Sequence, residues 1–164
     1  MMESPLLPAL AAGALGVVLI ALFFILIRRR RAADAPDAVA VHALVAMSQV
    51  AIADGRMDDA DVHQIAAILT RLTGKPYDPE HVMGMLERLA PTAADLDQVG
   101  KDLSDAQCQI VLEAALNIAV VDGEIRPSEY AVVSDLAQRL RVGAAPFRTA
   151  LTRVAAHLHT APAA

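Results

Sequence analysis

The sequence has little of what catalysis, disulfide bonding or aromatic packing requires. It contains no tryptophan, and aromatic residues make up only 3% of its 164 residues, so any core must be built from aliphatic side chains. Its single cysteine, Cys108, excludes an internal disulfide framework and a multi-cysteine zinc site. There is also no Gly-x-Ser-x-Gly elbow, no glycine-rich phosphate loop and no dinucleotide fingerprint. We therefore expect a protein that is not an enzyme, and no small-molecule substrate is identified.

Basic residues are scarce in the larger part of the chain. The formal net charge is −5, but residues 32–164 hold 10 Lys and Arg against 18 Asp and Glu. Binding to nucleic acid needs clustered basic residues that neutralise phosphates, so we expect no nucleic-acid partner. Ala and Leu, both strong helix formers, are abundant, and no segment alternates as a strand would. The sequence predicts an all-α protein.

One long stretch lacks charge altogether. Residues 5–27 form an apolar segment of 23 residues, which at about 1.5 Å per residue can cross a bilayer core of roughly 30 Å. Four basic residues follow it directly, namely Arg28, Arg29, Arg30 and Arg31. By the positive-inside rule we expect a single transmembrane helix over 5–27 in a bacterial inner membrane, with residues 1–4 outside and the following domain in the cytoplasm. The lipid bilayer is thus the first predicted partner.

The rest of the chain is predicted to form one compact helical bundle. We place a basic stop-transfer segment and linker at 28–37, the domain at 38–160 and a tail at 161–164. Apolar periodicity, prolines and capping patterns divide the domain into about seven helices. Their expected ranges are 38–53, 59–72, 79 to the proline at 91, 92–99, 104–121, 127–141 and 146–159. Asp58 is the expected N-cap of the second helix, Ser104 and Gln107 form the expected capping box of the fifth, and Gly143 is expected to end the sixth.

The domain contains an internal repeat. Residues 51–57, Ala-Ile-Ala-Asp-Gly-Arg-Met, align with residues 119–125, Ala-Val-Val-Asp-Gly-Glu-Ile, at a constant offset of 68. The correspondence continues into the following helices, where Asp61 aligns with Glu129. We therefore predict a two-fold repeat of helical hairpins about a pseudo-dyad, each with an Asp-Gly turn.

Each Asp-Gly turn has a purely structural interpretation. Gly55 and Gly123 can adopt the left-handed conformation that ends an incoming helix. Asp61 and Glu129 then lie in the first turn of the outgoing helix, where the positive end of the helix dipole favours a carboxylate. This interpretation needs no ligand.

The alternative is a site for a divalent cation. Its candidate ligands are Asp54, Asp61, Asp122, Glu124 and Glu129, because hard cations prefer several carboxylate oxygens. A standard EF-hand is excluded, since its first two ligand positions would be apolar in both copies, at Val50 and Ile52 and at Ile118 and Val120. A divalent cation thus remains a candidate cofactor.

The paired Asp-Gly-x-apolar-x-x-x-acid segments, Asp54–Asp61 and Asp122–Glu129, resemble the TerB-like helical domain of tellurite-resistance proteins over roughly residues 38–160. The resemblance implies a seven-helix bundle linked to tellurite or broader stress response, with acidic residues that bind metal or partners. Residue by residue it assigns this role to Asp54, Asp122 and Glu129, while Asp61 stands where the family usually has the longer Glu. The same domain follows a single anchor in DjlA-type membrane co-chaperones, but no His-Pro-Asp triplet occurs here, so the resemblance does not extend to a J domain.

These observations leave three hypotheses for the function. The first is a membrane-anchored, non-enzymatic module that binds another protein at the cytoplasmic face. The second is a divalent-metal-responsive domain that uses its acidic turns. The third is an accessory subunit of a larger membrane complex, in which the membrane helix provides most contacts.

Overall fold

The computed structural model describes residues 35–160 apart from Asp54. The chain divides into two compact units, and all but the first of these residues belong to the second unit, Pro36–Ala164. The predicted transmembrane helix at 5–27, the four arginines at 28–31 and the tail at 161–164 therefore lie outside the described residues. Within the described part, no helix is both long and apolar enough to span a bilayer.

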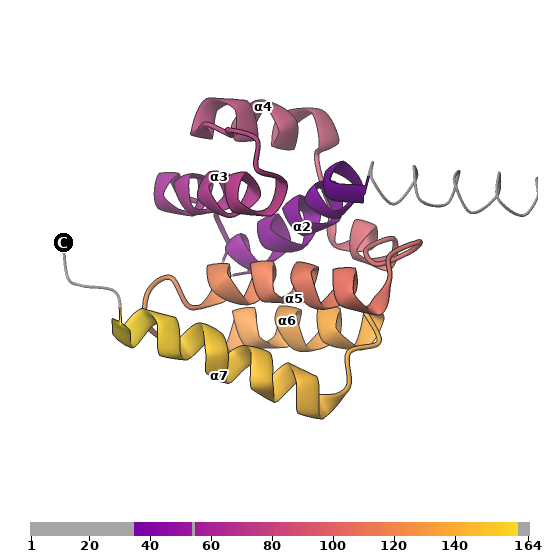
Figure 1. Ribbon diagram of the computed structural model, residues 1–164. Helices are drawn as coiled ribbons and strands as arrows, with labels where there is room; N and C mark the ends of the chain where they lie inside the picture. The colour runs from indigo at the N-terminus through magenta and orange to yellow at the C-terminus, as the bar shows by residue number, and fades with distance from the viewer. Residues whose placement is uncertain (1–34, 54, 161–164) are drawn as a thin grey trace, which may run out of the picture. The chain divides into compact units, whose positions relative to one another are not determined.

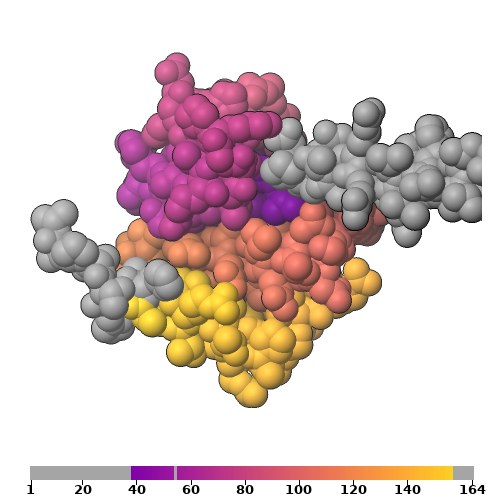
Figure 2. Space-filling model, viewed as in Figure 1, coloured from indigo at the N-terminus to yellow at the C-terminus, as the bar shows by residue number. Residues whose placement is uncertain are grey.

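The described part is all-α, as predicted, with six α-helices, one 3-10 helix and no strand (Figure 1). The elements are α2 (Ala35–Ala51), α3 (Asp59–Thr73), α4 (Pro79–Leu89), η1 (Ala93–Asp97), α5 (Asp105–Ala119), α6 (Pro127–Arg139) and α7 (Ala144–Thr160). Within the second unit α4 packs on α3, whereas both α6 and α7 pack on α5. Figure 2 shows α4 and α7 on opposite sides of the helical domain.

The predicted starts of α3, α4, α5 and α6 are confirmed. At α3, the Asp58 carboxylate accepts from the Asp61 backbone N–H, and the Asp61 carboxylate accepts from the Asp58 N–H, both at 3.0 Å. Ser104 and Gln107 form the same reciprocal box at the start of α5. Prolines occupy the first positions of α4 and α6, where no backbone N–H is needed. Local capping chemistry therefore fixes these boundaries.

The end of α6 differs from the prediction. Gly143 does not end this helix; instead Arg141 adopts the left-handed conformation, with φ 57°. The Arg141 N–H donates to the Gln138 carbonyl at 3.0 Å, and the Val142 N–H donates to the Ala137 carbonyl at 2.9 Å. This pair of bonds is a Schellman motif, and it places the apolar Val142 against the core. Burial of Val142 offsets the strain of a non-glycine residue at Arg141.

Other boundaries shift by a few residues. The first helix begins at Ala35 instead of 38, the last begins at Ala144 instead of 146, and α5 ends at Ala119 instead of 121. The segment predicted as a helix at 92–99 is a 3-10 turn at Ala93–Asp97. Its geometry follows from Asp95, whose carboxylate accepts from both the N–H and the hydroxyl of Thr92 and tightens the turn.

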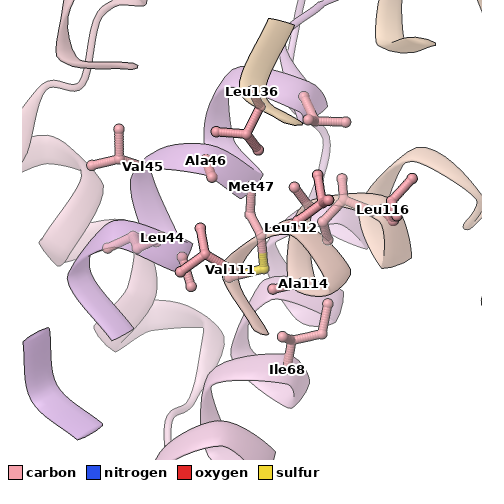
Figure 3. Close-up of a cluster of buried hydrophobic side chains, with 14 of the residues drawn as sticks. Leu44, Val45, Ala46, Met47, Ile68, Val111, Leu112, Ala114, Leu116 and Leu136 are labelled. Atoms are coloured by element: carbon pink, nitrogen blue, oxygen red, sulfur yellow. The ribbon is translucent and has the colours of Figure 1, made fainter. Parts of the chain in front are cut away.

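Helix α2 lies at the centre of the core. Every residue from Ala43 to Ala51 is buried. Figure 3 shows Met47 of α2 directed toward side chains of α5, with Leu136 and Ile68 on either side. The largest fully buried side chains are Leu44, Met47, Ile65, Leu69, Leu112, Leu116 and Leu136. This aliphatic core agrees with the absence of tryptophan from the sequence.

Candidate functional site

The two Asp-Gly turns meet at one cavity, which we call the paired-turn cavity. Its volume is about 260 Å³, and it is lined by Ala51, Arg56, Asp58, Ala60, Asp61, Ile118, Val121, Asp122, Arg126 and Glu129. Three predicted site residues, Asp61, Asp122 and Glu129, are therefore brought together from segments 68 positions apart. Glu124 is exposed and does not line the cavity, and Asp54 lies outside the described residues.

The two turns have matching backbones. Gly55 has φ 117° and Gly123 has φ 84°, so both have positive φ, but α2 and α5 already end at Ala51 and Ala119 and the glycines lie in the turns that follow. The N–H of Gly55 donates to the Ile52 carbonyl and that of Gly123 to the Val120 carbonyl, both at 2.9 Å and at equivalent repeat positions. A Cβ at either glycine would meet no atom within 4 Å, so positive φ alone selects glycine there.

Asp61 and Glu129 each complete a capping box at the start of the helix that follows the turn. Asp61 occupies the third position of α3 within the capping box, and Glu129 occupies the same position in α6. The Glu129 carboxylate accepts from the Arg126 backbone N–H at 2.8 Å. Both acids therefore have a structural role at their helix starts.

At one pair of positions related by the repeat, the two turns have side chains of opposite charge. Asp58 in the first turn corresponds to Arg126 in the second at the offset of 68. The Arg126 guanidinium forms an ion pair with the Asp122 carboxylate at 2.7 Å, and both side chains are about half exposed or more, at 48% and 63%. The paired-turn cavity is thus lined by carboxylates and guanidinium groups together.

This lining is not by itself a cation site. At least one oxygen of each of Asp58, Asp61, Asp122 and Glu129 already accepts a hydrogen bond from the protein. Among the described residues, no three His, Cys, Asp or Glu side chains are grouped so that they can hold one ion, and Asp54 is outside that set. Arg56 and Arg126 also bring positive charge to the cavity. The predicted cation site would therefore need a ligand beyond the described carboxylates.

The helical architecture and the paired turns agree with comparison to known families. A family model described as tellurite resistance protein TerB matches residues 38–152. The chain belongs to the TerB family. The match starts at the predicted beginning of the domain and ends within α7, so the TerB domain includes both Asp-Gly turns. No curated protein and no solved structure matches the chain.

A second feature of the TerB domain is a groove lined in part by Ile52 and Met57, which flank the first turn. An apolar groove of about 370 Å³, here called the α2–α4 groove, runs between the end of α2 and α4. Its lining residues are Ser48, Gln49, Ile52, Met57, Met83, Leu86, Glu87, Ala90 and Pro91. Ile52 and Met83 are 39% and 42% exposed, which is high for large apolar side chains.

Sequence reasoning did not identify the α2–α4 groove, because its apolar residues have the same spacing as core residues. The internal repeat shows how the exposure of this groove differs from that of the equivalent positions in the second half. Val120, which corresponds to Ile52, is 3% exposed, and Val154, which corresponds to Leu86 at the same offset, is 5% exposed. Equivalent positions are therefore covered in the second half of the TerB domain and open in the first.

Proposed function

We propose that this TerB-family protein is a membrane-tethered, non-enzymatic module that binds a partner protein through the α2–α4 groove. The observation that carries the proposal is the exposure of Ile52 and Met83 in that groove. Exposed apolar surface that is contiguous and rimmed by polar residues is typical of protein-binding sites. The methionine side chains are flexible and polarisable, and such residues suit adaptable binding surfaces.

The occupant that fits the groove is an amphipathic helix of the partner. In the second half of the domain α7 packs on α5, and Ala150 and Val154 of α7 are buried. At the offset of 68 residues α7 corresponds to α4, so its small aliphatic residues at four-residue spacing show how a helix packs within this fold, and we expect the same pattern on the partner helix. Glu87 lies in the α2–α4 groove, and Asp58 and Asp59 are exposed in the adjacent segment, so a basic edge on the partner helix would complement the site.

The tether belongs to the same proposal. The uncharged segment at 5–27 and the arginines at 28–31 support a cytoplasmic domain held at the inner membrane. Each carboxylate of the paired-turn cavity already accepts a hydrogen bond from the protein, which supports a role in holding the two turns. Family membership connects this module with tellurite resistance.

Pull-down from detergent-solubilised membranes tests the binding role. The full-length chain should recover a protein that residues 1–34 alone do not recover. Ile52→Glu and Met83→Glu should abolish recovery, because each places a charge in the apolar groove. Ile110→Glu is the matched control, since Ile110 is also 39% exposed and does not line the α2–α4 groove. Equal recovery by all three variants would overturn the proposal.

A divalent cation remains the second candidate function, favoured by the four carboxylates that line the paired-turn cavity. A cation that binds only the folded state raises its melting temperature. Melting of residues 36–164 in chelator, and then with calcium, magnesium, manganese or zinc, measures this effect directly. A rise for one ion that is lost in Asp122→Ala and Glu129→Ala would support cation binding, whereas unchanged melting with all four ions would exclude it.

A further inference from the structure

Charge is distributed very unevenly along the TerB domain. All eighteen acids of residues 32–164 lie at or before Asp135. Residues 136–164 contain no acid and four arginines, namely Arg139, Arg141, Arg148 and Arg153. An acidic domain therefore ends in a basic segment, which contains the whole of α7.

Helix α7 presents a shallow basic face opposite its buried face. Phe147, Ala150, Leu151 and Val154 pack on the core. The other side is a shallow depression lined by Ala145, Arg148, Thr149, Thr152, Arg153 and Ala156, all exposed, which we call the α7 basic face. Small residues occupy its centre and an arginine occupies each edge, so a planar surface can approach the helix beside Arg148.

The arginines of this segment differ in their ion pairs. Arg139 is paired with Asp97 and Asp135, and Arg153 is paired with Glu113 at 2.5 Å. Arg148 has no ion pair with any described residue. The charge of Arg148 is therefore available to an external anion.

The hydroxyl groups of the α7 basic face are already engaged. The Thr149 hydroxyl donates to the Ala145 carbonyl at 3.1 Å, and the Thr152 hydroxyl donates to the Arg148 carbonyl at 2.9 Å. These groups offer no donor to a particular phosphate oxygen, so the face attracts a negatively charged surface and does not form a pocket for one ligand. It also has no large exposed apolar side chain of the kind that anchors a protein interface.

We propose that the α7 basic face docks on the anionic lipid headgroups of the membrane in which the chain is anchored. This inference rests on the proposed membrane tether. Only residues 28–34 separate the predicted span from α2, and seven residues reach at most about 25 Å, which keeps the domain near the bilayer. The negative surface potential attracts the basic end of the domain and repels its acidic remainder, which orients the domain. Docking of α7 leaves the α2–α4 groove, on another helix pair, open to a partner.

The test uses the full-length chain in lipid nanodiscs. A donor fluorophore is attached at Thr152→Cys, in the centre of the α7 basic face, and the acceptor is a headgroup-labelled lipid. Native Cys108 is buried and so resists labelling in the folded protein. A second donor site, Ala67→Cys, is exposed on α3. Discs of phosphatidylcholine are compared with discs that also contain phosphatidylglycerol, at low and high salt.

Docking predicts that energy transfer from residue 152 rises in the anionic discs, while transfer from residue 67 does not, and that high salt reverses the rise. Arg148→Gln should lower the ratio of docked to undocked protein about fivefold, and Arg148→Glu should lower it further. Arg88→Gln is the matched control, because it removes an exposed arginine from α4. It should change the ratio less than twofold.

The possible failures are distinguishable. Equal transfer in both kinds of disc, or equal effects of Arg148→Gln and Arg88→Gln, would overturn the docking while leaving the tether intact. A change at residue 152 caused by soluble polyglutamate but not by phosphatidylglycerol would also overturn it, and would indicate an acidic protein partner instead. A chain that fails to enter discs at all would contradict the tether and, with it, the docking.

Discussion

Replacing Glu129 by glutamine and by alanine separates a capping role from a role of its charge. The Glu129 carboxylate accepts from the Arg126 N–H at 2.8 Å, and the amide oxygen of Gln107 accepts from the Ser104 N–H at the same distance. This protein therefore completes a capping box with either a glutamate or a glutamine side chain. Glutamine at 129 keeps the acceptor and loses only the charge.

The expected magnitudes follow from this geometry. Glu129→Ala removes the acceptor and should lower the free energy of unfolding by about 1 kcal/mol. Glu129→Gln should lower it by at most about 0.5 kcal/mol, which is the interaction of one exposed charge with the helix dipole. For the 129 residues of 36–164 the unfolding entropy is roughly 0.27 kcal/mol per degree, so the expected losses in Tm are about 4 °C and at most about 2 °C.

The assay is thermal melting of residues 36–164 in chelator, followed by circular dichroism. Gln107→Ala and Gln107→Glu are the matched controls: the first should lower Tm, whereas the second should leave Tm unchanged or raise it slightly, because it adds a charge that the helix dipole favours. If Glu129→Gln lost as much stability as Glu129→Ala, while Gln107→Glu remained harmless, the capping argument would be refuted. The charge of Glu129 would then be what the fold requires.

Three further predictions concern the core and its titratable groups. Gly100→Ala should cost about 1–3 kcal/mol more than Gly74→Ala in urea unfolding, because both glycines have positive φ but a Cβ at Gly100 would lie 2.5 Å from Leu140 Cδ2 while one at Gly74 meets nothing. Burial lowers the pKa of His42, against an opposing effect of Asp102, so stability should be full above the ordinary imidazole value of about 6.5 and fall on acidification below it. His42→Gln should flatten that fall, as measured by unfolding at pH 7 and pH 5. Burial also raises the pKa of the Cys108 thiol, which is 1% exposed, so iodoacetamide should react with it only as fast as the domain opens, and Gly100→Ala should speed that reaction.

Local chemistry explains why so much of the fold could be predicted. Asp58, Ser104 and the prolines at 79 and 127 act on their own helix starts, so their effect is visible in the sequence. The end of α6 could not be predicted in the same way. Arg141 takes a conformation that glycine favours because Val142 then packs on the core, and that contact is made by the tertiary structure.

In the candidate site, too, some features were visible in the sequence and others depend on tertiary contacts. The repeat offset alone pairs Asp61 with Glu129, and both residues cap their helices and line one cavity. The reversal of charge at Asp58 and Arg126 is also visible in the sequence. Only the structure shows that both residues line the same cavity. The exposure of Ile52 could not be predicted, because it depends on how α4 lies beside α2, whereas the equivalent Val120 is covered.

Site-specific photo-crosslinking in intact cells tests the proposed binding role most directly. A photoreactive residue replaces Ile52 in the full-length chain, and the same residue replaces Ile110 in the control, because the two isoleucines are equally exposed at 39% and only Ile52 lines the α2–α4 groove. We predict one protein adduct from position 52, lost when Met83→Glu is added, and none of that mass from position 110. The same adduct from both positions, or no adduct from position 52, would contradict the account.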